Sequence, residues 1–177
     1  MAVPTPRIQA SHCFAFEHDF VGSWRCIPLC VRRKLDLIGL KLKLSHWLEL
    51  TQAQRQQLVD WPDQPEALQQ LHEQLLTWTR PMADGEARPL PVAVAEPWQQ
   101  LETVAAEVQR AAQQRNKELS REQWAELGEL GRFALCKLAR PGHDHHNLEA
   151  AFAELLLPSA PSDGSPEYQE AAQPDIP

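Results

Sequence analysis

The densest group of side chains with chemical potential lies in residues 140–147, Arg-Pro-Gly-His-Asp-His-His-Asn. Imidazole nitrogens and carboxylate oxygens are ligands that zinc and related metals accept. His143, His145 and His146 are therefore candidate metal ligands, together with Asp144 and a cysteine from elsewhere. The spacing lacks the second ligand pair of a zinc finger, and Asp, Asn and His are also common where a helix begins. We predict a structural turn here, with no metal centre and no bound cofactor.

The four cysteines, Cys13, Cys26, Cys30 and Cys136, include no Cys-x-x-Cys pair. Cys26 and Cys30 are one helical turn apart, so their thiols could share a face in a redox or ligand role. Cys136 follows Phe133 in an apolar run and is expected to be a small buried hydrophobe. Cysteines without a disulfide pattern indicate a reducing, cytoplasmic compartment.

A second distinctive segment is basic. Residues 25–43 contain six basic residues against Asp36 alone, in a chain whose net charge is −7. The six are Arg25, Arg32, Arg33, Lys34, Lys41 and Lys43. One interpretation is a solvated surface, and the other is a docking face for an acidic protein or a phosphate-bearing group. The sequence predicts an acidic molecule with one basic face.

Motifs of several functional classes are missing from the sequence. There is no P-loop, no Gly-x-Gly-x-x-Gly, no nucleophile elbow and no Ser-His-Asp order, so we do not expect an enzyme. No apolar run reaches the roughly 18 residues that a membrane span needs, and no charged-then-apolar signal segment opens the chain. We therefore expect no membrane partner and a cytoplasmic location.

Periodicity predicts helices with short connections. Pro28 and Gly39 delimit a helix whose residues Val31, Leu35 and Ile38 share one face. Leu40–Leu44 alternates and predicts a short strand. Further helices are expected over 66–79 and 98–115, and after Asn147. A proline-rich connection, 80–97, is expected to be extended. Flanking the helical domain, 14–157, we predict a flexible N-terminus, 1–13, and a disordered acidic tail, 158–177.

Two segments of the chain share one pattern, Trp-x2-Leu-x4-Arg-x2-Leu. It begins at Trp47 and again at Trp124, and each copy predicts a short capped helix followed by a longer one. In each, the arginine (Arg55 or Arg132) is expected to reach back to carbonyls or an acid. The fold class is therefore mainly α: a small single domain of two repeated helical hairpins plus flanking helices. We further expect the hairpins to pack face to face, with a minimal β-ribbon between 40–44 and the residues before Ser120.

Helical hairpins also raise the alternative of a nucleic-acid-binding regulator. The second helices of the two hairpins, 52–60 and 129–139, carry only Arg55, Arg132 and Lys137 as basic residues. So few cations cannot neutralise a phosphate backbone. We expect no nucleic-acid partner.

Two motifs resemble a known family. Arg-Cys-Ile-Pro at 25–28 and Arg-Phe-Ala-Leu-x-Lys-Leu-x-Arg-Pro-Gly-His at 132–143 are similar to the nitrate reductase-associated proteins, the NarM type of cyanobacteria. The resemblance covers roughly 14–152. It implies a small, cytoplasmic, non-catalytic accessory protein needed for the activity or maturation of the assimilatory, molybdenum-cofactor nitrate reductase. Asp144 stands where the family usually has Glu, and His145, His146, Cys13 and Cys30 lie outside the family pattern.

The resemblance and the basic segment together predict a docking surface for nitrate reductase, or for its cofactor-loading or electron-donor complex. Its predicted residues are Arg25, Cys26, Arg32, Arg33, Lys34, Lys41, Arg140, Pro141, Gly142, His143, Asp144 and Asn147. The alternative that stays open is a small metal- or redox-cofactor carrier that uses the histidine-rich loop and the cysteines.

Overall fold

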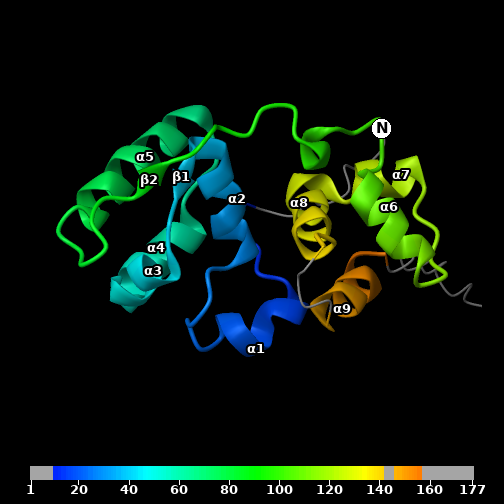
Figure 1. Ribbon diagram of the computed structural model, residues 1–177, viewed down its shortest axis with the longest axis horizontal. Helices are drawn as coiled ribbons and strands as arrows, with labels where there is room; N and C mark the ends of the chain where they lie inside the picture. The colour runs from blue at the N-terminus through cyan, green and yellow to red at the C-terminus, as the bar shows by residue number, and fades with distance from the viewer. Residues whose placement is uncertain (1–9, 142–145, 157–177) are drawn as a thin grey trace, which may run out of the picture.

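The computed structural model describes residues 10–141 and 146–156, and they form a mainly α fold with a two-stranded ribbon (Figure 1). This confirms the predicted fold class. The first half contains η1 (Ala15–Glu17), α1 (His18–Val21), α2 (Leu29–Ile38), β1 (Leu40–Lys41), α3 (Leu44–Glu49), α4 (Gln52–Asp60) and α5 (Pro65–Thr79). The second half contains β2 (Arg88–Pro89), η2 (Pro97–Gln99), α6 (Ala106–Gln113), α7 (Arg121–Glu126), α8 (Gly128–Leu138) and α9 (His146–Leu155). Within these ranges, no helix is long and apolar enough to cross a bilayer.

Helix α2 begins and ends where the sequence predicts. Pro28 has an extended backbone immediately before it, and Gly39 ends it in the left-handed region with φ 65°. The N-terminus is capped from a distance, because Oε1 of the buried Glu17 accepts a hydrogen bond from the Leu29 amide at 2.8 Å. Burial nevertheless raises the pKa of this carboxyl group, although its hydrogen bonds from Leu29 and Phe14 act in the opposite direction.

Both predicted hairpins form, α3–α4 and α7–α8, and each tryptophan of the pattern is fully buried. Helices α4 and α7 each begin with a reciprocal capping box. Thr51 Oγ1 accepts from the Gln54 amide, and Ser120 Oγ accepts from the Gln123 amide, both at 3.1 Å. The short helix α3 starts at Leu44, and it is capped because His46 Nδ1 accepts a hydrogen bond from the Lys43 amide at 3.1 Å.

The repeated arginines reach back to carbonyls in both copies. Arg55 donates to the carbonyls of Trp47 and Leu48, both at 2.8 Å. Arg132 donates to the Ala125 carbonyl, the position equivalent to Leu48, at 3.3 Å and to the Trp98 carbonyl at 3.0 Å. Carbonyls at the end of a helix have no partner within the helix, so a guanidinium that spans several of them closes the hairpin.

Three expectations are wrong, for tertiary reasons. The helix expected over 98–115 starts only at Ala106, because the buried Trp98 packs edge-to-face on Phe133, with ring centroids 5.1 Å apart, and its carbonyl accepts from Arg132. Strand β1 pairs antiparallel with β2, in the proline-rich connection, and not with the residues before Ser120. The hairpins do not pack face to face, since α3 and α4 lie on the far side of α2 from α8 (Figure 1).

Helix α8 belongs to two hydrophobic clusters at once. Leu130, Phe133 and Ala134 pack with residues of α2, α4 and α5. Leu127 and Leu135 pack with residues of α6 and α9. Because these residues alternate between two faces of the helix, α8 joins the two clusters. Its contact with α2 also holds the C-terminal end of α8 beside α2.

Candidate functional site

The two distinctive segments of the sequence meet at one groove of about 320 Å³ beside α2. We call it the cationic groove. It is lined by Cys26, Ile27, Arg32, Leu35, Asp36, Leu40, Lys41, Leu42, Leu44, Leu90, Lys137 and Arg140. Residues from both predicted docking segments, 25–43 and 140–147, therefore contribute to one site.

Each wall of the groove comes from a different element. Arg32, Leu35 and Asp36 lie three and four residues apart and thus share one face of α2. Lys41 follows from β1, where the alternation of a strand leaves Leu40 buried and Lys41 exposed. Lys137 lies in the last turn of α8, and Arg140 follows two residues after the helix ends. The contact between α2 and α8 is thus what brings Arg140 close to Arg32.

The floor of the groove is apolar. Ile27, Leu35 and Leu40 are buried, whereas Leu44 and Leu90 at the edge are 50% and 45% exposed. Leu90 reaches the groove because its amide donates to the Gly39 carbonyl at 2.8 Å, which holds the proline-rich connection against the end of α2. Exposed leucines beside a polar rim are typical of surfaces that bind another protein.

The rim of the groove is positively charged. Lys137 Nζ lies 2.8 Å from an Asp36 carboxylate oxygen, so these two charges neutralise each other. The side chains of Arg32, Lys41 and Arg140 remain, and all three residues are exposed. Arg32 is fixed in place, since its Nε donates to the Ile27 carbonyl at 3.2 Å. Three cations around an apolar floor create a positive potential on a protein whose net charge is −7.

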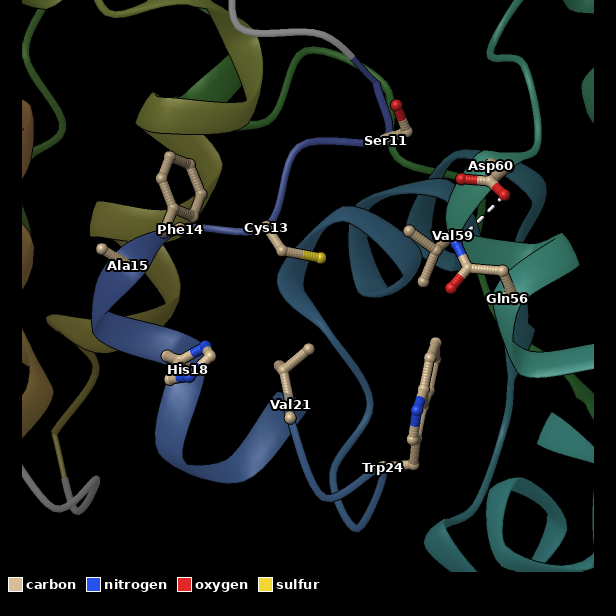
Figure 2. Close-up of a pocket in the computed structure, with 11 residues that line it drawn as sticks. Ser11, Cys13, Phe14, Ala15, His18, Val21, Trp24, Gln56, Val59 and Asp60 are labelled. Atoms are coloured by element: carbon tan, nitrogen blue, oxygen red, sulfur yellow. Dashed lines mark hydrogen bonds between the residues drawn. The ribbon is translucent and has the colours of Figure 1, made fainter.

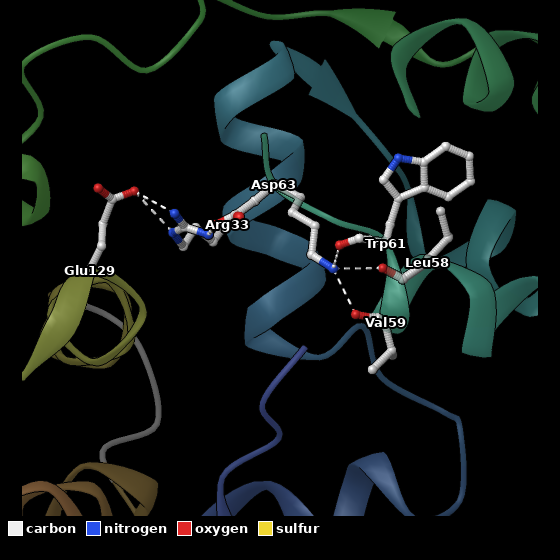
Figure 3. A network of polar contacts seen from close by, with 7 residues as sticks. Arg33, Leu58, Val59, Trp61, Asp63 and Glu129 are labelled. Carbon is white, nitrogen blue, oxygen red and sulfur yellow. Dashed lines mark hydrogen bonds and ion pairs between the residues drawn. The ribbon is translucent and has the colours of Figure 1, made fainter. Parts of the chain in front are cut away.

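Arg33 and Lys34 are a correction to the predicted docking surface, because both are buried. Arg33 makes ion pairs with Asp63 at 3.0 Å and Glu129 at 2.7 Å (Figure 3), and the second pair joins α2 to α8. Lys34 Nζ donates to the carbonyls of Leu58, Val59 and Trp61 at 2.7–2.9 Å and caps the end of α4. Burial lowers the pKa of Lys34. Both side chains are structural and unavailable to a partner.

The remaining predicted residues divide into two groups. Arg25 and Pro141 are exposed but do not line the groove, and Asn147 is half-buried in the first turn of α9. Gly142, His143, Asp144 and His145 lie outside the described residues, as does the side chain of His146. Of the predicted set, the groove brings together Cys26, Arg32, Lys41 and Arg140.

Eight residues that line the groove were not in the predicted set, among them Asp36, Leu44, Leu90 and Lys137. The ion pair between Asp36 and Lys137 links two helices about a hundred residues apart, and charge alone gives no signal for such a pairing. Leu90 belongs to a proline-rich segment without periodicity. Only its alternation with Val92 and Val94 hints that it faces a surface.

The residues that the structure describes give no support to metal binding. Among residues 10–141 and 146–156, no group of three or more His, Cys, Asp or Glu side chains could hold a metal ion. The histidine-rich loop stays a prediction, because most of it lies outside those ranges.

Comparison with known proteins gives one match. A family model described as "Conserved nitrate reductase-associated protein" matches residues 13–155, a range that contains every residue of the cationic groove. Neither a curated protein nor a solved structure matches the chain.

Proposed function

Because the chain belongs to the family of nitrate reductase-associated proteins, we propose that it is a non-catalytic accessory protein that docks on nitrate reductase through the cationic groove. The observation that carries this proposal is the convergence of Arg32, Lys41 and Arg140 on one apolar groove. These residues come from two segments about a hundred positions apart. The charges gather there although the chain as a whole is acidic.

The chemistry of the groove defines the segment of the reductase that would fit. An apolar floor selects one or two large aliphatic or aromatic side chains, and a rim of three cations selects carboxylates around them. The partner is therefore an acidic amphipathic segment on the surface of the reductase. Charges at the rim of an interface mainly raise the association rate. At 0.1 M ionic strength, salt screens the attraction between charges that are more than about 10 Å apart.

Charge reversal in the groove tests the proposal. The triple variant Arg32→Glu, Lys41→Glu, Arg140→Glu should bind purified nitrate reductase at least about tenfold more weakly than the unchanged protein, which corresponds to about 1.4 kcal/mol of binding free energy. Binding is measured by surface plasmon resonance at two salt concentrations. Weaker binding of the unchanged protein at high salt is also expected.

The matched control reverses three exposed arginines away from the groove, Arg80→Glu, Arg110→Glu and Arg121→Glu. Both triple variants change the net charge equally, so a loss restricted to the first assigns the effect to the groove. Melting temperatures of both variants show that each is folded. Equal loss in the two variants would reject the groove, and no binding by the unchanged protein would reject docking itself.

A further inference from the structure

A second pocket, of about 690 Å³, lies between the N-terminal segment and α4 (Figure 2). One wall comes from residues 11–22, and the other comes from Trp24 and the C-terminal half of α4. The pocket shares no residue with the cationic groove. Its volume is within the range of about 300–1,000 Å³ that is typical of small-molecule sites. The size of the pocket therefore fits a small organic ligand.

The walls of this pocket are largely apolar. Phe14 and Val59 are buried, and Val21 and Trp24 are half-buried. Figure 2 shows the indole ring of Trp24 nearly edge-on, so that one face of the ring is turned across the pocket toward Val21. An aromatic face opposite a branched aliphatic side chain forms a slot that accepts a flat ring.

The backbone of Trp24 is fixed in an unusual conformation that holds this ring in place. Its φ is 57°, in the left-handed region that bulky side chains rarely adopt. The Trp24 carbonyl accepts hydrogen bonds from Trp47 Nε1 at 2.8 Å and from Arg55 Nη1 at 3.1 Å. The Trp24 amide donates to the Val21 carbonyl at 2.9 Å. The first hairpin thus maintains a strained residue at the pocket wall, and such residues cluster at ligand sites.

The charge of the lining is negative. Among the described residues that line the pocket, the exposed Asp60 is the only carboxylate, and none is a lysine or an arginine. Gln56 Nε2 donates to Asp60 Oδ2 at 3.0 Å and fixes the carboxylate on the pocket wall. The Lys34 ammonium acts against a bound cation, but it donates to three carbonyls at the end of α4 and does not line the pocket. The carboxylate therefore selects a positively charged ligand.

We propose that this pocket binds an aromatic amine in its cationic form, with the ring against the Trp24 indole and the ammonium group beside Asp60. The ring gains an aromatic contact and the burial of its apolar surface. The ammonium group gains an ion pair with the carboxylate. A neutral molecule of the same shape gains only the first contribution, and an anion is repelled by Asp60 without a compensating cation in the lining.

An NMR titration of the full-length protein tests this assignment with three small probes. Benzylamine carries the positive charge, benzyl alcohol is a neutral molecule of the same shape, and benzoate is an anion. Benzylamine should bind with a dissociation constant on the order of 1 mM, a value expected for so small a molecule. The indole N–H of Trp24 and the side-chain amide of Gln56 should shift. Benzyl alcohol should bind about fivefold more weakly, and benzoate should not bind.

Four single variants divide the contributions of charge and ring. Asp60→Asn should weaken benzylamine binding about fivefold and leave benzyl alcohol unaffected. Its matched control, Asp19→Asn, removes the same charge from an exposed residue of α1 outside the lining and should have less than about a twofold effect. Trp24→Leu should weaken both probes. Trp78→Leu, at another half-buried tryptophan that does not line the pocket, should weaken neither.

Three results would each overturn the proposal. The first is the absence of shifts at Trp24 and Gln56 with benzylamine at about tenfold the expected dissociation constant. The second is equal affinity for benzylamine and benzoate, and the third is an equal loss in Asp60→Asn and Asp19→Asn. Melting temperatures show that each variant is folded. No reductase is present, so failure of this titration leaves the docking proposal unaffected, and failure of docking leaves the amine site unaffected.

Discussion

At the scale of single residues, the positive charge of a side chain did not determine whether it is structural or available to a partner. Lys34 and Lys41 belong to the same basic segment, but one is fully buried and the other is exposed. The last carbonyls of any α-helix have no amide donor within the helix. At the end of α4 the Lys34 ammonium supplies these missing hydrogen bonds. The Lys41 ammonium has no such structural use and remains available at the rim of the groove.

Replacement of the two lysines by methionine separates these roles. Lys34→Met leaves three carbonyls, two of them in buried hydrogen bonds, without their charged donor and should lower the free energy of unfolding by about 3 kcal/mol. Lys41→Met should change it by less than about 0.5 kcal/mol, the usual range for an exposed site. Urea denaturation followed by circular dichroism measures both. Similar losses in the two variants would contradict the structural role of Lys34.

At the scale of elements, the proline-rich connection has a defined place. Its strand β2 pairs with β1, and the Ala93 amide donates to the Asp36 carbonyl at 3.0 Å. The connection therefore satisfies carbonyls at the end of α2 and places Leu90 at the groove. Gly39 is the point of closest approach, since a Cβ there would lie 2.5 Å from the Leu90 carbonyl oxygen.

Two glycines with similar backbone angles allow a controlled test of this contact. Gly39 has φ 65° and Gly85 has φ 71°, but a Cβ at Gly85 would have no neighbour within 4 Å. Gly85→Ala should therefore cost only the backbone strain, about 1 kcal/mol. Gly39→Ala adds a clash with the connection and should cost about 3 kcal/mol.

Hydrogen exchange adds a local readout to these stability measurements. In Gly39→Ala the amides of Leu90 and Ala93 should exchange faster than in Gly85→Ala, because the clash displaces their acceptors. Equal destabilisation of the two variants, with both amides still protected, would contradict this expectation. It would mean that the proline-rich connection accommodates the new methyl group without a loss of stability.

At the scale of the whole molecule, α8 couples two hydrophobic clusters. Phe133 packs in one and Leu135 in the other, and both are fully buried. Glu154 of α9 also accepts hydrogen bonds from the amides of Ala15 and Phe16, which ties the last described helix to the first. Neither half can lose its packing without exposing a face of α8, so the protein should unfold in one step.

A core substitution in the second cluster tests this coupling. Phe152→Ala removes a ring that is 1% exposed in the second cluster and should lower the free energy of unfolding by about 3–5 kcal/mol. Tryptophan fluorescence and far-ultraviolet circular dichroism should report the same denaturation midpoint in the variant. Two separated transitions would mean that the clusters are stable independently.

The sequence by itself determined much of the local structure. The capping boxes at Thr51 and Ser120, the limits of α2 at Pro28 and Gly39, and the two Trp–Leu–Arg–Leu hairpins depend on contacts within a few turns of helix. Such contacts leave a pattern in the spacing of residues. The family was recognisable for a similar reason, because its two motifs are continuous in the chain.

Only the tertiary structure decided which of the basic and thiol side chains meet. The packing of α2 on α8 buries Arg33, exposes Arg32 and brings Arg140 to the same groove as Lys41. The fold also separates Cys26 from Cys30, since Cys26 lines the cationic groove and Cys30 is buried in the first turn of α2. These arrangements depend on which helix faces which, and residues distant in sequence carry no periodic signal for that choice. The side chains with potential chemistry were visible in the sequence, but the cationic groove that some of them form required the packing of distant segments.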